Sequence, residues 1–150
     1  MTDVVIQNVC DENVPEASAF VGWAIAALAG RSDEMEMTIR LVSPEEMQSL
    51  NRTYRGKDAL TNVLSFPADE VVRAMHGLLG DVVICPDVVE SEARAQNKRR
   101  DDHYAHLTVH GVLHLLGYDH IDDREADEME NLETQLLATL GIDNPYSATY

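Results

Sequence analysis

The stretch LTVHGVLHLLG, residues 107–117, has the pattern that organises the rest of the sequence. It is apolar nearly all round, with His110 and His114 among its few polar residues, and it ends in glycine. A helix that is apolar on every side lies in the interior of a protein, and glycine commonly ends a helix in a left-handed turn. We therefore predict a buried helix over residues 103–116, closed at Gly117.

Alternation and helix-boundary residues place the other elements around this helix. In residues 35–42, Met, Met, Ile and Leu occupy every second position, which is the period of a half-buried strand. Ser43, Pro44 and Glu46 then form the pattern of a helix start with a capping box. Further strands are predicted at residues 4–9, 62–66 and 80–85, and further helices at residues 16–29, 43–54, 86–99 and 124–140.

The predicted element order is β-α-β-α-β-β-α-α-α, with most helices after the sheet-forming part. This order favours the α+β class over a doubly wound parallel fold. We expect a single mixed sheet of about four strands packed against several helices, with the histidine-bearing helix buried as a metal-binding helix. The 150 residues are the usual size of one domain, and residues 143–150 are expected to form a loose tail.

The chain is strongly acidic, with 11 Lys and Arg against 27 Asp and Glu and a formal net charge of −16. This balance is opposite to the usual footprint of a nucleic-acid-binding protein, so any RNA function needs a local positive surface. Seven of the 11 basic residues fall in a first basic stretch, residues 52–57, and a second basic stretch, residues 94–100. The simpler interpretation of both is a solvated helix face.

The sequence has no recognisable export or membrane signal. Its start, MTDVVIQNV, lacks the basic and small-residue features of a secretory signal, and its longest apolar run, residues 20–30, is too short to span a bilayer. Cys10 and Cys85 have no CxxC partner, which argues against a disulfide framework and against a thiolate zinc site. We expect a cytoplasmic protein without a membrane partner.

The histidines form the pattern HxxxHxxGxxH. His110 and His114 lie one turn apart on the same face of the predicted helix, and the reversal at Gly117 lets His120 return toward the same point. Three protein ligands and an open fourth position are typical of a catalytic zinc site. We predict one Zn²⁺ per chain, although other divalent transition metals also accept imidazole. Such an ion activates a water molecule for hydrolysis.

His106 forms a competing series with His110 and His114. The outer two of these are separated by about 12 Å of helix rise, which is too far for them to share one ion. His106 offers no third ligand beyond His110, so the downstream set is preferred. His106 is left as a core residue, a residue that supports a ligand, or a substrate contact, while His103 and His76 are expected on the surface.

Three ordered segments resemble the YbeY family, the bacterial rRNA-maturation endoribonucleases. They are LNRTYRGKDALTNVLSFP at residues 50–67, GDVVICPD at residues 80–87 and HGVLHLLGYDH at residues 110–120. The resemblance implies a single-strand-specific, metal-dependent endoribonuclease, usually with zinc, that acts in maturation of the 16S rRNA 3′ end and in ribosome quality control. The implied partners are the single-stranded 16S rRNA precursor and the ribosome or its proteins, and no DNA is expected.

The resemblance also assigns roles to individual residues. It carries the family's three metal ligands over to the histidine trio already named, and its functionally important arginine over to Arg55. A guanidinium can grip a phosphate with two hydrogen bonds and stays charged, so Arg55 suits catalysis and substrate binding, and Lys57 adds attraction. Without the motif, Arg55 would be interpreted as a helix C-terminal residue that favours the macrodipole. One departure is Asn62, where the family usually has Asp.

Two other functions fit parts of the pattern. The histidine spacing is also that of the metzincin proteases, HExxHxxGxxH, in which the Glu after the first His is the general base. Gly111 has no side chain at that position, so peptide hydrolysis is the weaker alternative. The other alternative is a non-enzymatic, zinc-stabilised ribosome-assembly factor, because the net negative charge suits protein partners as readily as RNA.

Overall fold

The computed structural model describes residues 3–10, 13–28, 35–119 and 122–146. In chain order its elements are β1 (Asp3–Asn8), α1 (Ala17–Ala27), β2 (Glu36–Leu41), α2 (Pro44–Arg55), β3 (Val63–Pro67), α3 (Glu70–His76), β4 (Leu78–Ile84), α4 (Pro86–Ala95), α5 (Arg100–Leu115) and α6 (Asp123–Thr139). The predicted α+β class with one mixed sheet is confirmed.

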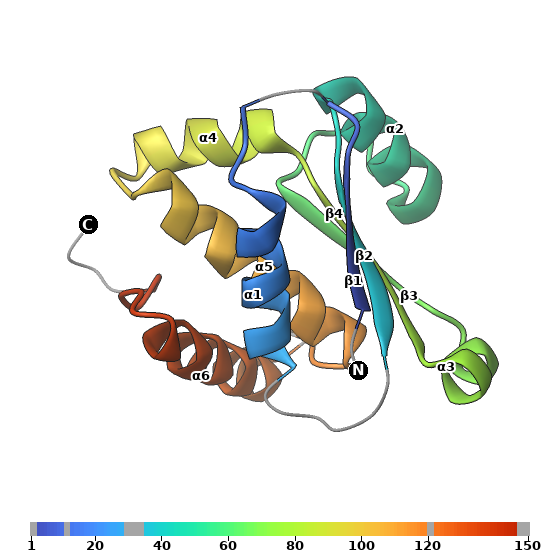
Figure 1. Ribbon diagram of the computed structural model, residues 1–150. Coiled ribbons are helices and arrows are strands. Elements are labelled where there is room, and N and C mark those ends of the chain that lie inside the picture. Colours follow the sequence, from blue (N-terminus) through green and yellow to red (C-terminus); the bar gives the residue numbers. More distant parts are fainter. Residues whose placement is uncertain (1–2, 11–12, 29–34, 120–121, 147–150) are drawn as a thin grey trace.

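The four strands form a sheet in the order β1-β2-β4-β3. β1, β2 and β4 are parallel, and β3 pairs antiparallel with β4 at one edge. On β2, Met37, Ile39 and Leu41 are buried in the main core, which confirms the predicted alternation. Helices α1 and α5 pack on this face of the sheet, α4 and α6 lie on the same side against α5, and α2 lies on the opposite face (Figure 1).

The histidine-bearing helix α5 is the central helix of the core, as predicted. Ten of its 16 residues are buried, and it packs against α1, α4 and α6 as well as β3 and β4. A smaller apolar cluster lies under α2 on the other face of the sheet, and consists of Val42, Met47, Leu64, Val83 and Cys85. The two clusters hold α2 and α5 on opposite sides of the same strands.

Gly111 allows α5 to lie directly on the sheet. A Cβ atom at this position would come within 2.6 Å of Val82 Cγ1 and 3.3 Å of Ser65 Oγ. The Ser65 hydroxyl of β3 instead donates a hydrogen bond to the Gly111 carbonyl, with a distance of 2.9 Å. This close contact fixes the histidines of α5 beside the edge strand β3.

Helix α3 is missing from the sequence prediction, which left residues 68–79 without an element. The Asp69 side chain accepts a hydrogen bond from the backbone N–H of Val71 at its start, and Gly77 ends it. None of its residues is buried, so it lacks the apolar period by which a helix is recognised in a sequence. His76, at its end, is exposed, as predicted.

The last described residues lie against α5 and α6. Residues 143–150 were expected to form a loose tail, and residues 147–150 lie outside the described part of the chain. The ring of Tyr146 meets that of His106 edge to face, with 5.3 Å between the ring centroids. Among the described residues, no helix has the length and apolar character that a membrane crossing requires.

Candidate active site

A cavity of about 510 Å³ lies where the end of α2, the strand β3 and the second half of α5 meet. Its lining includes Arg55 and Lys57 from the first basic stretch and His110 and His114 from α5. These residues are far apart in the sequence, and the structure brings all four to one space. The remaining lining residues are Asn51, Thr61, Asn62, Val63, Leu64, Ser65, Pro67, Gly117, Tyr118 and Asp119.

His110 and His114 bring their Nε2 atoms close together. His110 Nε2 and His114 Nε2 are 3.1 Å apart. Two nitrogens bound to one tetrahedral zinc ion at 2.0–2.1 Å would be roughly 3.3 Å apart. The pair therefore has the separation that a shared divalent ion requires, and the predicted convergence of these two residues is present.

Glu133 of α6 determines which ring nitrogen of His110 carries the proton. Glu133 Oε1 is 2.5 Å from His110 Nδ1, so this ring nitrogen carries the proton and donates to the carboxylate. The other ring nitrogen, Nε2, is the atom that lies beside His114 Nε2. A carboxylate behind a histidine in this manner is common at metal sites, where it orients the ligand and increases its basicity.

Glu133 is fully buried and yet charged. Burial by itself raises the pKa of its carboxyl group, but the His106 ring 3.6 Å away and the hydrogen bonds from His110 and Tyr146 outweigh this effect and lower the pKa to about 2. A carboxylate inside the protein costs several kcal/mol unless such bonds compensate for it. The arrangement therefore keeps a negative charge directly behind the candidate metal ligand.

A second set of possible ligand atoms lies on the other side of His110. His106, His110 and Glu133 each offer one ligand atom, and all of these atoms lie within 4.8 Å of one another. This set shares His110 with the pair formed by His110 and His114. The donor atoms of either set suit a divalent transition metal, so the residues present fit a metal cofactor.

The chain turns back toward the cavity after α5. Gly117 has a φ of +102°, and the backbone N–H groups of Gly117 and Tyr118 donate to the carbonyls of His114 and Leu113. This is the left-handed helix end predicted at Gly117. Tyr118 and the residue after it then line the cavity. The predicted third ligand, His120, lies outside the described residues.

Asn51 holds the loop that carries Lys57, a role that no pattern in the sequence indicates. Its side chain is buried, and its Nδ2 donates a hydrogen bond to the Ala59 carbonyl at 2.9 Å. The backbone carbonyl of Asn51 accepts a hydrogen bond from the backbone N–H of Lys57, with a distance of 3.2 Å. Arg55, the last residue of α2, and Lys57 are thereby presented at the same wall of the cavity.

His103 is in the interior, and its predicted surface position is wrong. Only 4% of its surface is exposed, and its Nε2 lies 3.0 Å from Glu92 Oε1 on α4. The same carboxylate oxygen accepts a hydrogen bond from Asn62 Nδ2. Burial lowers the pKa of His103, although Glu92 opposes this effect. The helix α5 starts at Arg100, earlier than predicted, and its first turns are therefore part of the core.

Glu133 and Tyr146 are functional candidates that the sequence interpretation missed. Glu133 occupies a position on α6 where Met129 before it and Leu136 and Leu137 after it are buried. A lone acidic residue within an apolar stripe is a signal that could have been read from the sequence. Tyr146 gave no such signal, because only the fold brings its hydroxyl group to Glu133.

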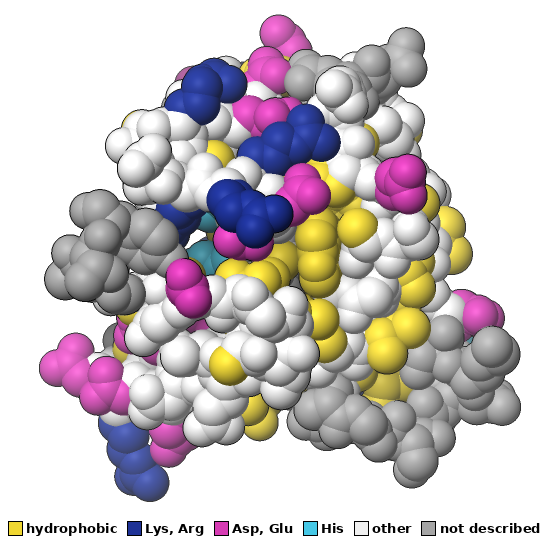
Figure 2. Space-filling model, turned by 60° about the vertical axis from the view of Figure 1, so that its left-hand side comes forward, with side chains coloured by type: hydrophobic (Ala, Val, Ile, Leu, Met, Phe, Trp, Pro, Cys, Tyr) yellow, Lys and Arg dark blue, Asp and Glu magenta, His cyan; other side chains and the backbone are white. Residues whose placement is uncertain are grey.

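The charges on the described surface are distributed unevenly. Figure 2 shows Asp and Glu side chains scattered over one face, while Lys and Arg side chains gather on its upper part, above a hollow in which histidine is visible. The first basic stretch supplies Arg55 and Lys57 to the cavity itself. The cavity thus has two positive side chains on its lining, in a chain with a net charge of −16.

The family model for endoribonuclease YbeY matches residues 7–141, a range that includes both walls of the cavity. The chain belongs to the YbeY family. An endoribonuclease YbeY from Stenotrophomonas maltophilia (strain K279a) is 57% identical over 138 residues, which is 89% of this chain and 86% of that protein. One from Pseudomonas putida is 54% identical over 148 residues, or 98% and 94% of the two chains.

The fold agrees with this family membership. A solution structure of a Thermotoga maritima protein is similar to the chain with a TM-score of 0.60 and 27% sequence identity. The match covers 91% of this chain and 87% of the other. The resemblance seen in three short sequence segments thus extends over nearly the whole molecule.

Proposed function

We propose that this YbeY family member, an endoribonuclease, uses a zinc ion held by His110, His114 and His120 to hydrolyse single-stranded RNA. Its role is the maturation of the 3′ end of 16S rRNA and ribosome quality control. The observation that carries the proposal is the convergence of His110 Nε2 and His114 Nε2, 3.1 Å apart, in the cavity that Arg55 also lines.

The residues of the cavity have different roles in phosphodiester hydrolysis. Arg55 holds the phosphate with two parallel hydrogen bonds and stabilises the charge that develops on its oxygens. Lys57 adds a flexible positive charge that attracts the backbone of the RNA. The histidines hold the ion through neutral imidazole rings. When bound, the ion supplies a nucleophilic water at neutral pH and a Lewis acid for the phosphoryl oxygen.

The distribution of charge supports delivery by a partner. The cavity wall is basic, whereas the chain as a whole has a net charge of −16, which repels RNA at long range. A purely electrostatic search for RNA is therefore disfavoured. We expect a ribosomal protein or another ribosome component to bring the enzyme to the 16S rRNA precursor in the cytoplasm.

The position of Gly111 argues against peptide hydrolysis. The general base of the related protease pattern would have to occupy this position, and the space that its Cβ would need is already filled by Val82. A non-enzymatic assembly factor would need the metal but not Arg55. The test below therefore separates metal binding from cleavage.

The experiment measures zinc content and RNA cleavage in the same preparations. The purified chain should contain about one zinc per molecule and cleave a labelled single-stranded RNA but not its duplex. Cleavage should stop after removal of the metal with a chelator and return with added zinc. Arg55→Ala should keep the metal and lose about 10²-fold or more in cleavage rate, as is typical when a group that stabilises transition-state charge is removed.

Arg52→Ala is the matched control, because Arg52 is on the same helix, is 61% exposed and contacts Asp58. This variant removes the same charge from outside the cavity and should cleave RNA at the wild-type rate. Equal cleavage by Arg55→Ala and Arg52→Ala would reject the proposed role of Arg55. A zinc-loaded chain that never cleaves RNA would favour the assembly-factor alternative.

A further inference from the structure

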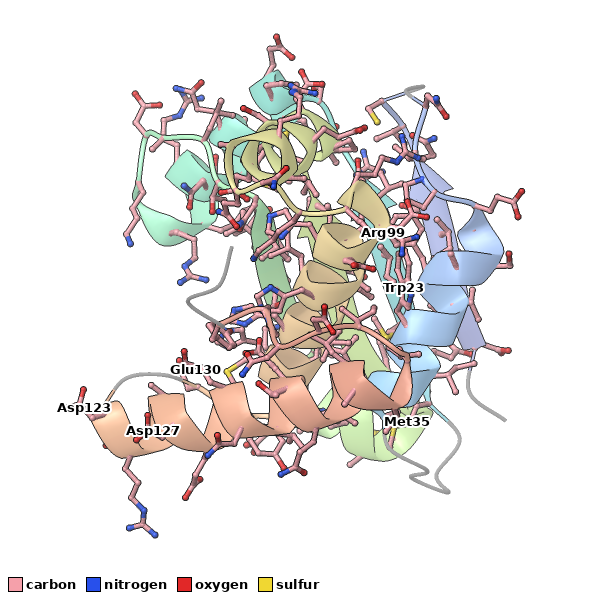
Figure 3. All side chains as sticks on the ribbon, turned by 90° about the vertical axis from the view of Figure 1, so that its left-hand side faces the viewer. Trp23, Met35, Arg99, Asp123, Asp127 and Glu130 are labelled. Carbon is pink, nitrogen blue, oxygen red and sulfur yellow. The ribbon has the colours of Figure 1, made fainter. Side chains whose placement is uncertain are left out.

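Among the described residues, Glu133 is the only acidic residue whose side chain is buried. It belongs to α6, which crosses α5 with Asp123 and Asp127 at its outer end (Figure 3). Its neighbours on α6 that face the core are Met129, Leu136 and Leu137. Such a position is occupied by an apolar residue in most helices, so the carboxylate needs a specific reason to be there.

The two oxygens of Glu133 have different partners. Oε1 accepts the Nδ1 proton of His110, while Oε2 accepts the hydroxyl proton of Tyr146. The Tyr146 oxygen in turn lies 3.1 Å from His106 Nε2, which can donate to it. The contacts form a continuous chain from the C-terminal segment through α6 to the candidate metal ligand on α5.

This series of hydrogen bonds fixes the orientation of the His110 ring and determines which of its nitrogens carries the proton. A carboxylate that is bonded through one oxygen only can rotate, whereas the Tyr146 hydroxyl group holds the second oxygen of Glu133. With Oε1 fixed, His110 can ligate only through Nε2, the atom that lies 3.1 Å from His114 Nε2. Orientation of a ligand by such outer partners typically changes metal affinity by about 10- to 100-fold.

We infer that Tyr146 and Glu133 are positioning residues of the metal centre, so that the described C-terminal segment, residues 143–146, takes part in metal binding. The inference rests on the proposed function, because it takes His110 and His114 as metal ligands. Tyr146 fixes the orientation of Glu133, and Glu133 fixes His110 in the tautomer whose Nε2 faces the ion. The C-terminal segment then completes the site from the side opposite the RNA cavity.

The test measures zinc affinity of the full chain by competition with a chromophoric chelator, and records the visible spectrum of the cobalt-substituted protein. Tyr146→Phe removes only the hydroxyl group and should weaken zinc binding by about 10-fold, and Glu133→Gln should weaken it by about 10- to 100-fold. Both should alter the cobalt spectrum, which a loss of general stability would not do. Tyr54→Phe removes a hydroxyl group from a residue that is 66% exposed, and should leave zinc affinity unchanged.

Thermal unfolding of the metal-free variants checks that each one folds. If Glu133→Gln does not fold, Tyr146→Phe alone decides the inference. Wild-type zinc affinity and an unchanged cobalt spectrum in Tyr146→Phe would overturn it.

His114→Ala separates failure of this inference from failure of the proposed function. Loss of zinc in His114→Ala, together with normal zinc binding in Tyr146→Phe and Glu133→Gln, would leave the proposed metal site intact and reject the positioning role. Full zinc retention in His114→Ala combined with zinc loss in Glu133→Gln would instead indicate that His106, His110 and Glu133 hold the ion. That outcome would overturn both the proposed ligand set and the positioning role.

Discussion

The two basic stretches of the chain look alike in sequence but have different surroundings in the fold. In the first, Arg55 and Lys57 line the cavity beside the candidate metal ligands. In the second, the guanidinium of Arg100 lies 3.4 Å from Glu90, and Lys98 Nζ donates to a backbone carbonyl at 3.4 Å. The first stretch therefore presents charge to a ligand, while the second joins helices and the C-terminal segment to one another.

The difference shows that a count of charges does not identify a binding surface. Both stretches were equally compatible with a solvated helix face, and the position of each relative to the histidines distinguishes them. Substitutions of Arg55 and Lys57, the two basic residues of the first stretch that line the cavity, should change RNA cleavage, whereas substitutions around the second stretch should change stability. The following predictions test this division.

The largest effect is expected from a conservative change in the first stretch. Arg55→Lys keeps the positive charge but replaces a planar fork of donors by a single ammonium group. If Arg55 binds phosphate through two hydrogen bonds, the variant should lose about 10-fold in kcat/KM, which corresponds to about 1.4 kcal/mol. Steady-state cleavage of a labelled single-stranded RNA measures the change. Full activity of Arg55→Lys would show that charge alone is needed.

The second prediction concerns pH and the interior beside the second stretch. Burial lowers the pKa of His103 below its usual 6.5, and Lys98 adds to this shift. The unfolded chain thus takes up this proton at a higher pH than the folded protein does. Stability due to this residue is full above pH 6.5 and falls by up to about 1.4 kcal/mol per pH unit below it.

Urea unfolding of the metal-free protein at a series of pH values measures this dependence. His103→Gln cannot titrate, so its stability should decrease less steeply than that of the wild type below pH 6.5. Parallel curves for the two proteins would contradict the assignment of a lowered pKa to His103. The absolute stability of the variant does not affect this comparison.

A smaller effect is expected from Lys57→Ala in the first stretch. Lys57 is exposed and acts through attraction, so its removal should increase KM by about 3-fold with little change in kcat. The difference from the wild type should decrease as salt concentration rises, because salt screens exposed charges. A salt-independent loss of kcat would instead place Lys57 at the reacting phosphate.

The smallest effect is expected from Arg100→Ala in the second stretch. The guanidinium is only partly buried, so loss of its contact with Glu90 should lower the free energy of unfolding by less than about 1 kcal/mol. RNA cleavage at low temperature should not change. A loss of cleavage comparable to that in Arg55→Ala would mean that the second stretch also binds the substrate.

Periodic patterns in the sequence predicted the framework of the fold. The alternation in β2 and the apolar helix α5 both arise from local spacing, and burial follows that spacing directly. Helix α3 was not predicted, because none of its residues is buried and its sequence therefore lacks an apolar period. His103 was misplaced because an isolated polar residue near a predicted helix end gives no indication of the carboxylate that will meet it, here Glu92 on α4.

The active site was predictable only where its residues are close in sequence or belong to a family motif. His110 and His114 share a helix face, and Arg55 follows from the resemblance. The roles of Glu133 and Tyr146 depend on how α6 and the C-terminal segment pack against α5. Such contacts join residues far apart in the chain, and the local sequence marks only Glu133, as an acidic residue within an apolar stripe, without indicating its partners.

The missing side chain at Gly111 has a consequence for the depth of the cavity. Val82 already occupies the place where a methyl group at this position would go, so even alanine would have to push α5 outward or displace the strand beneath it. His110 and His114 would move with the helix, while Arg55, anchored on the far side of the sheet, would stay. Gly111 thus helps to determine the distance between the Arg55 guanidinium and the imidazole rings of His110 and His114, although it holds no side chain near either group.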